Sequence, residues 1–310
     1  MPADLDLPEL VRQTANAYGE VGAEWVRNLP AVVAELEPRW DITVGATLTG
    51  GTASYVAEAT TRDGAAVVLK ITLPAATDGA AGFDRAVRTF ALADGRGCAR
   101  LIAHDAERSA LLVERLGPNL DSLVLPVARQ LEIICATVRQ MWVPVPPGTP
   151  LPTGAEKAQW LADFIAMAWT ALDRPCSRRT VGIALSFASE RAAAFDPDTA
   201  VLVHGDAHSW NTLDAGGGEF KLVDPEGLIS EPAHDLAVPM RELNDELLAG
   251  DALRLGRERA ALLARLTGVD ETAIWQWGFI ERVSTGLYSM THGHVGARDF
   301  LEVADRWAEA

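Results

Sequence analysis

Polar residues at the end of an apolar run carry the strongest chemical signal in the sequence. The run Val201–Val203 predicts a buried strand, which ends at His204-Gly205-Asp206. Asn211 follows five residues after Asp206, and Asp224 ends a second short apolar run. The two runs and the glycine-rich turn between them indicate a hairpin with polar groups at both of its ends. The carboxylate of Asp206 is therefore separate from the pair formed by the Asn211 amide and the Asp224 carboxylate.

These three polar residues suit phosphoryl transfer. Amide and carboxylate oxygens are ligands for Mg²⁺, which accepts one or two protein groups and completes its shell with water and phosphate oxygens. Asn211 and Asp224 are therefore the expected metal ligands. Asp206 is the expected catalytic residue, because a carboxylate can orient an attacking hydroxyl and accept its proton.

The same stretch also permits a metal site of a different class. His204, Asp206 and His208 alternate along the chain, and alternate positions of a strand lie on one face. His292 and His294 could supply further ligands. A metal-dependent hydrolase built on these residues would bind Zn²⁺ or Mn²⁺ tightly.

An upstream region predicts a sheet that binds phosphate. Three runs of β-type composition, separated by short turns, cover residues 42–48, 54–60 and 66–73. Lys70 is the one charged residue among apolar neighbours in the third run, where a lysine is rare unless it is paired. The link between the first two runs contains residues whose backbone could approach nucleotide phosphates: Gly50, Gly51, Thr52 and Ser54.

The loop also resembles a known family. His204-Gly205-Asp206, with Asn211 and Asp224, resembles the catalytic loop of the aminoglycoside phosphotransferases, which share the protein-kinase-like fold. Three further stretches resemble the streptomycin 6-phosphotransferase and hydroxyurea phosphotransferase branch: residues 223–228, 231–236 and 280–288.

The resemblance implies an α+β, bilobal protein-kinase-like fold, with ATP bound between a small antiparallel β N-lobe and a larger, mainly helical C-lobe. We expect the N-lobe over residues 1–116. It begins with a helical extension over residues 1–38 that breaks near Pro30 and closes at Pro38. The C-lobe, residues 117–310, would contain the catalytic loop and the substrate site.

The resemblance also implies residue roles. Lys70 would hold the α- and β-phosphates of ATP and pair with a carboxylate on the next helix, where the sequence offers only Asp84 in place of the usual Glu. The backbone from Glu114 to Leu116 would contact the adenine edge. Asp235 would hold the catalytic loop by bonding its backbone.

The implied activity is ATP- and Mg²⁺-dependent transfer of phosphate to a hydroxyl of a small molecule. The expected acceptor is a streptomycin-type aminoglycoside or hydroxyurea, as in antibiotic resistance. A kinase of another metabolite and a non-catalytic nucleotide-binding module remain alternatives, because a fold does not fix an acceptor. Streptomycin's guanidinium groups would suit acidic residues near the site, for which the candidates are Glu226, Glu231, Glu242, Asp245 and Glu281.

Composition restricts the partners. The 310 residues include 27 Lys and Arg against 43 Asp and Glu, a formal net charge of −16 that repels nucleic acid and anionic lipid and attracts cations. The sequence lacks a long apolar run and an apolar N-terminal segment, so we expect neither a membrane span nor a signal peptide. Three separated cysteines indicate free thiols in the reducing cytoplasm. We expect a monomer or weak dimer that binds a small cationic substrate.

Overall fold

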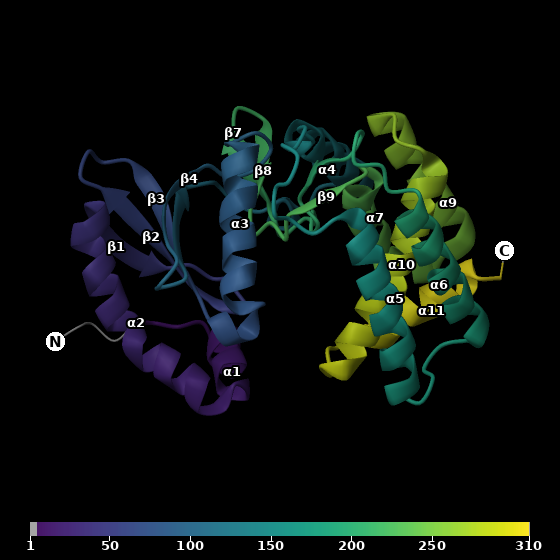
Figure 1. Cartoon of the computed structure of the whole chain (residues 1–310), viewed down its shortest axis with the longest axis horizontal. Helices are drawn as coiled ribbons and strands as arrows, with labels where there is room; N and C mark the ends of the chain where they lie inside the picture. Colours follow the sequence, from purple (N-terminus) through teal and green to yellow (C-terminus); the bar gives the residue numbers. More distant parts are fainter. Residues whose placement is uncertain (1–4, 310) are drawn as a thin grey trace. The chain divides into compact units, whose positions relative to one another are not determined.

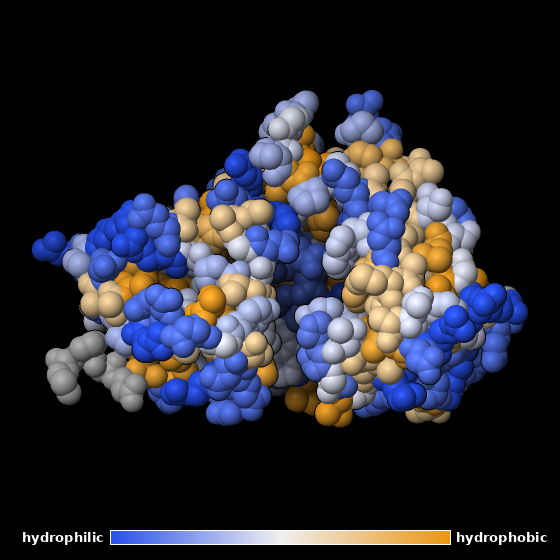
Figure 2. All heavy atoms as spheres, turned by 60° about the horizontal axis from the view of Figure 1, so that its bottom comes forward, coloured by the Kyte–Doolittle hydropathy of each residue, from blue (hydrophilic) through white to orange (hydrophobic). Residues whose placement is uncertain are grey.

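The computed structural model describes residues 5–309, which form two compact units. The first unit is Met1–Gly117 and the second is Pro118–Ala310. Figure 2 shows hydrophilic side chains on the visible surface of both units, mixed with smaller hydrophobic patches.

A strongly twisted antiparallel sheet forms the centre of the first unit (Figure 1). Within residues 5–117 its five strands lie in the order β1-β2-β3-β5-β4. Alternating burial defines its faces: Val67, Leu69 and Ile71 of β3 are buried, whereas Lys70 between them is half-buried. The strands are β1 (Ile42–Thr47), β2 (Ser54–Thr61), β3 (Ala66–Thr72), β4 (Leu101–Asp105) and β5 (Ala110–Glu114).

Two N-terminal helices cover this sheet, α1 (Glu9–Ala17) and α2 (Gly19–Trp40). The predicted break at Pro30 is wrong, because the chain breaks at Tyr18 and Gly19 and α2 continues through both prolines to Trp40. Packing offsets the hydrogen bond that each proline removes. The buried apolar side chains of α2 pack in one cluster with those of the sheet, among them Leu29, Val33, Leu36, Leu69 and Ile71.

A third helix of the first unit, α3 (Gly79–Ala93), lies beside the sheet. It follows a short 3-10 turn, Pro74–Ala76, and ends at Asp94, whose backbone is left-handed. Its buried residues include Phe83 and Phe90, which are seven positions apart and therefore share one face.

The second unit is mainly helical and is built around α10 (Glu271–Thr291). Fifteen of the 21 residues of α10 are buried, so other elements enclose it on nearly every side. A capping box at Thr153 starts α5, and Asp side chains cap the starts of α9 and α10. The remaining helices are α4 (Val127–Met141), α5 (Gly154–Ala171), α6 (Arg178–Ala193), α7 (Ala233–Arg241), α8 (Asn244–Ala249), α9 (Ala252–Thr267) and α11 (Ala297–Trp307).

Two small antiparallel pairs of strands complete the second unit. β6 (Val201–Val203) pairs with β9 (Leu228–Ser230), and β7 (Thr212–Gly216) pairs with β8 (Glu219–Leu222). The predicted hairpin between residues 201–203 and 220–223 is therefore wrong. The glycine-rich stretch predicted as its turn begins inside β7, which includes Gly216, and the turn is confined to Gly217 and Gly218. The loop from His204 to Asn211 thus connects two separate strand pairs.

The expectation of free thiols is confirmed, because Cys98, Cys135 and Cys176 are all buried and free. Burial raises the pKa of the Cys135 and Cys176 thiols to about 12, so both remain protonated at neutral pH. Over residues 5–309, none of the helices has both the length and the apolar character needed to cross a membrane.

Candidate active site

The side chain of Asp235 fixes the start of the loop. Its Oδ2 accepts hydrogen bonds from the backbone N–H of His204 (3.1 Å) and from the indole N–H of Trp142 (2.9 Å). Its Oδ1 accepts the backbone N–H of Gly205 at 2.8 Å. Asp235 is fully buried on α7, beyond the N-cap position, so the expectation that it holds the loop through its backbone is confirmed.

His204 joins the loop to the end of β8. Its Nδ1 accepts the backbone N–H of Asp206 (3.2 Å), which leaves the proton on Nε2, and Nε2 donates to the carbonyl of Val223 (2.9 Å). Burial lowers the pKa of His204, so the ring is neutral at physiological pH. Because both nitrogens are used within the protein, His204 is not available as a metal ligand.

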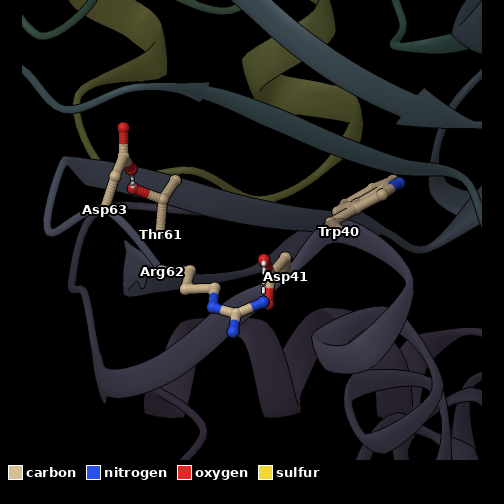
Figure 3. A pocket seen from close by; sticks show the side chains of 5 residues that line it. All are labelled: Trp40, Asp41, Thr61, Arg62 and Asp63. Carbon is tan, nitrogen blue, oxygen red and sulfur yellow. Dashed lines mark hydrogen bonds and ion pairs between the residues drawn. The ribbon is translucent and has the colours of Figure 1, made fainter.

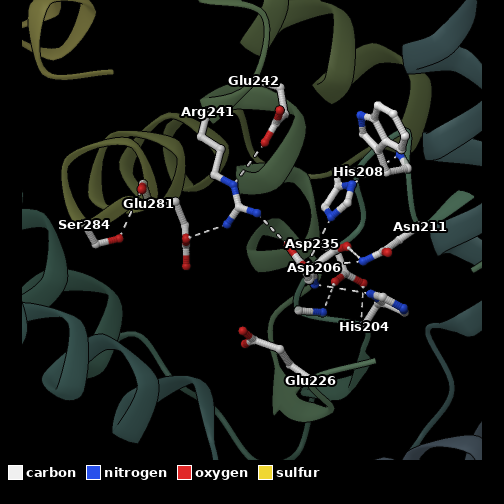
Figure 4. A network of polar contacts seen from close by, with 12 residues as sticks. His204, Asp206, His208, Asn211, Glu226, Asp235, Arg241, Glu242, Glu281 and Ser284 are labelled. Carbon is white, nitrogen blue, oxygen red and sulfur yellow. Dashed lines mark hydrogen bonds and ion pairs between the residues drawn. The ribbon is translucent and has the colours of Figure 1, made fainter. Parts of the chain in front are cut away.

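Asp206 lies at the centre of a polar cluster (Figure 4). Its Oδ1 contacts Arg241 Nη2 at 2.5 Å. Its Oδ2 contacts His208 Nε2 (3.3 Å) and Asn211 Nδ2 (3.2 Å). Burial by itself would raise the pKa of Asp206, but the His208 hydrogen bond and the Arg241 charge outweigh burial and hold the pKa well below its ordinary value. Asp206 is therefore ionised at neutral pH.

Asn211 and Asp224 flank the open end of the β7–β8 pair. Thr212 is paired with Leu222, and the N–H of Val223 donates to the carbonyl of Asn211 at 2.9 Å. The Asn211 amide nitrogen donates to both the backbone and the side chain of Asp206, which directs its Oδ1 elsewhere. Asp224 has a left-handed φ of 58°, uncommon outside glycine and frequent at functional sites. One amide oxygen and one carboxylate fit the protein share of a magnesium shell.

Arg241 connects Asp206 to two glutamates that the sequence left as candidates only. Its Nη1 contacts Glu281 on α10 (3.1 Å) and its Nε contacts Glu242 (3.3 Å) (Figure 4). The other three candidate acids do not contact Arg241 in the described part of the chain. Glu226 pairs with Lys157 at 2.9 Å, Glu231 contacts Arg191 and Trp277, and Asp245 is exposed on α8.

The structure places the predicted phosphate-binding residues on two strands of the first unit and the link between them. Lys70 stands on β3, opposite Val56 of β2 and Leu111 of β5. Gly50 has a φ of 112°, and a Cβ on Gly51 would approach the Ser54 carbonyl oxygen to 2.9 Å, so this link requires glycine. Thr52 is exposed, whereas Ser54 is buried and its hydroxyl donates to Thr72.

The other predicted nucleotide-binding residues lie on α3 and at the end of β5. Asp84 is exposed on α3, and its pairing with Lys70 stays a prediction. The Glu114 N–H donates to the Arg100 carbonyl (3.0 Å), and its carboxylate accepts the Arg100 N–H (2.7 Å). These bonds commit the Glu114 N–H to strand pairing. Leu116 follows β5, and the contact of the Glu114–Leu116 backbone with the adenine edge stays a prediction.

A hollow in the first unit lies away from these residues (Figure 3). It is lined by Trp40 and Asp41 at the end of α2 and by Thr61, Arg62 and Asp63 at the β2–β3 turn. Arg62 contacts Asp41 at 3.8 Å, and the Thr61 hydroxyl donates to Asp63. None of the predicted site residues lines this hollow.

The family follows from comparison with known proteins. The model of the aminoglycoside/hydroxyurea antibiotic resistance kinase family matches residues 39–293. The chain belongs to this family. It is 31% identical to a streptomycin 6-kinase of Streptomyces glaucescens, over 93% of this chain and 92% of that protein. It is 29% identical to a hydroxyurea phosphotransferase of Kitasatospora aureofaciens, over 94% of this chain and 83% of that protein. The resemblance stated from the loop is therefore confirmed, and the chain is a small-molecule kinase.

Solved structures show the fold. Choline kinase LicA of Streptococcus pneumoniae has a TM-score of 0.59 at 12% identity, covering 90% of this chain and 98% of that chain. Aminoglycoside phosphotransferase APH(4)-Ia, in a complex with AMP-PNP and hygromycin B, has a TM-score of 0.58 at 16% identity, covering 90% and 99%. The expected α+β, protein-kinase-like fold is confirmed.

For a kinase of this family, the metal-hydrolase interpretation is wrong. Across residues 5–309, no three His, Cys, Asp or Glu side chains are grouped so that they could hold a metal ion. Both ring nitrogens of His204 are hydrogen-bonded, to the Val223 carbonyl and to the Asp206 N–H. The rings of His292 and His294 lie together after α10. A magnesium ion held by two protein groups and by phosphates needs no such cluster.

Arg241 is the site residue that the sequence did not indicate, and its role is testable. In Arg241→Met the pKa of Asp206 should rise toward its ordinary value, because the guanidinium favours the ionised carboxylate. The acidic limb of the kcat–pH profile should then move to higher pH, with about tenfold lower activity near about pH 3 than the parent enzyme retains there.

Arg254→Met is the matched control, because Arg254 forms an exposed pair with Glu258 on α9. Its profile should match that of the parent enzyme. A uniform loss of kcat at every pH in Arg241→Met, without a shift of the limb, would show that Arg241 does not tune Asp206.

Proposed function

We propose that the chain transfers the γ-phosphoryl group of ATP to a hydroxyl of a streptomycin-type aminoglycoside. The observation that carries the proposal is the orientation of Asp206 by Arg241, His208 and Asn211 within a family that includes streptomycin 6-kinases. The negative composition of the chain supports a cationic acceptor. ATP use and free thiols suit the cytoplasm.

Asp206 would receive the acceptor at one particular oxygen. A carboxylate oxygen accepts up to two hydrogen bonds. Oδ2 already faces His208 and Asn211, whereas Oδ1 has one partner within residues 5–309, Arg241. The remaining position on Oδ1 would accept the hydroxyl proton. The lowered pKa of Asp206 is compatible with this role, because phosphoryl transfer through a loose transition state depends more on positioning than on base strength.

The residues predicted to bind nucleotide and metal keep the roles that the family resemblance implies. Asn211 and Asp224 would hold Mg²⁺, which supplies charge neutralisation at the β- and γ-phosphates when it is bound. Lys70 would contact the α- and β-phosphates, with Asp84 as its carboxylate partner. The link through Gly50, Gly51, Thr52 and Ser54 would cover the phosphates, and the backbone from Glu114 to Leu116 would meet the adenine.

A transfer assay tests the proposal. The chain is incubated with Mg-ATP and either streptomycin or hydroxyurea, and products are examined for a gain of about 80 mass units, the mass of one phosphoryl group. We expect a phosphorylated streptomycin. Transfer to hydroxyurea alone would assign the chain to the other activity found in the family. ATP binding without transfer to either acceptor would leave a kinase of a different metabolite.

A further inference from the structure

One face of α5 is an exposed stripe of large apolar side chains. Trp160, Phe164 and Met167 follow Lys157 at intervals of three and four residues, so all four lie on the same side of the helix. Trp160 is 57% exposed and Met167 is 64% exposed. The rings of Trp160 and Phe164 are stacked, with centroids 5.7 Å apart and planes within 7°. Monomer surfaces normally scatter such side chains singly.

The helix α10 presents a second, narrower stripe. Although most of α10 is buried, Thr285 is half-buried and Tyr288 is 48% exposed. Tyr288 lies seven residues after Glu281, and His292 four residues later, so the three occupy one side of the helix and of its C-terminal end. The rings of Tyr288 and His292 are 4.1 Å apart between centroids.

Both stripes begin beside Asp206. Glu281, at the inner end of the α10 stripe, contacts Arg241, which contacts Asp206 (Figure 4). Lys157, at the inner end of the α5 stripe, contacts Glu226, and the Cβ of Glu226 would lie 3.0 Å from a Cβ on Gly205, the residue before Asp206. The two helices also pack against each other. The exposed rings therefore extend from the cluster around Asp206 along two neighbouring helices.

We propose that four of these rings bind a second ring of the acceptor and thereby select for a multi-ring molecule. The four, called the ring platform, are Trp160 and Phe164 on α5 and Tyr288 and His292 after Glu281. This ring platform rests on the proposed function, because it assumes that the acceptor hydroxyl lies at Asp206. Seven helical residues span about 10 Å, which sets the distance from the cluster to Tyr288. A linked-ring aminoglycoside covers that distance, whereas hydroxyurea is far shorter.

The chemistry of the platform suits a cationic sugar. Aromatic faces bind both cations and the apolar faces of sugar rings. The Lys157 ammonium lies 5.2 Å from the centroid of the Trp160 ring, within the distance of a cation–π contact. Glu226, Glu242 and Glu281, at the inner end of the platform, add negative charge. A cationic multi-ring acceptor could therefore contact both the aromatic rings and the acidic inner end of the platform.

Substitution of the exposed rings tests the platform, with streptomycin as the probe. We expect Tyr288→Ala and Trp160→Ala each to raise the Kd for streptomycin about tenfold, measured by titration calorimetry on the full chain. The KM for streptomycin should rise similarly with kcat nearly unchanged, and the Kd for Mg-ATP should stay unchanged. Turnover of hydroxyurea, if the chain performs it, should not change. Tyr18→Ala is the matched control, because Tyr18 is 43% exposed in the first unit.

The outcomes separate the platform from the proposed function. If streptomycin binding depends on Tyr288 and Trp160 but no phosphate is transferred, the platform stands and the proposed function fails. If streptomycin is phosphorylated with the same KM by the variants, the platform is wrong and the function stands. Absence of streptomycin binding to the parent chain overturns both. Loss of a dimer in Tyr288→Ala, seen by sedimentation, would instead identify the surface as an interface between copies and overturn the platform.

Discussion

Replacing Asp206 by Asn is expected to reduce the rate of phosphoryl transfer by about 10²–10⁴-fold while leaving the affinity for Mg-ATP within about twofold. The amide has the same shape as the carboxylate, but it cannot accept the proton of the acceptor hydroxyl. It also cannot hold the negative charge that draws Arg241 and His208 toward Oδ1 and Oδ2. The loss should therefore fall on kcat. Single-turnover kinetics with streptomycin and a separate ATP titration measure the two effects independently.

Asp224→Asn is the informative comparison for this variant. If Asp224 is a magnesium ligand, its substitution should weaken Mg-ATP binding as well as transfer, and the loss should depend on the concentration of Mg²⁺. The assignments would have to be exchanged if Asp206→Asn lost its ATP affinity and Asp224→Asn kept it. Equal effects in both variants would show that the two carboxylates act on the same ion.

Replacing Asp235 by Ala is expected to lower the free energy of unfolding by about 3–5 kcal/mol. The substitution removes the acceptor of three donors, the N–H groups of the buried residues His204 and Gly205 and the indole N–H of the part-buried Trp142. Asp235→Asn keeps one oxygen and should lose less. Urea denaturation of the parent chain and both variants gives the values.

Asp245→Ala is the stability control, because Asp245 is exposed on α8 and its replacement should change the free energy of unfolding by less than about 0.5 kcal/mol. The expected role of Asp235 would be contradicted if Asp235→Ala unfolded at the same urea concentration as the parent chain. A variant that stays folded but is inactive would locate the effect in the loop itself.

The sequence revealed local chemistry better than distant contacts. Asp206, Asn211 and Asp224 lie within one short segment, and their spacing was sufficient to predict a phosphotransferase loop. Arg241 and Glu281 lie far along the chain from Asp206, on two helices whose packing brings them to it. An arginine at the end of a helix carries no pattern that distinguishes an active-site partner from a solvated charge, so only the fold could reveal Arg241.

The strand order of the second unit was mispredicted for a related reason. β6 and β9 have only three residues each, and runs that short carry no information about their partner. The predicted helix break at Pro30 was wrong for a different reason. Local rules place a helix end near a proline, but burial of Leu29 and Val33 against the sheet outweighs the one lost hydrogen bond. Tertiary packing overrides local preference in both cases.

The enclosure of α10 has a consequence for how this enzyme can evolve. Nearly every substitution along that helix must either empty or overfill the core of the second unit, at a cost of about 1–5 kcal/mol. Six residues of α10 escape this constraint because part of each side chain faces solvent: Glu271, Thr272, Thr285, Tyr288, Met290 and Thr291. A lineage that acquires a new acceptor range should therefore accumulate its changes at these few permissive positions, while the rest of α10 stays nearly invariant.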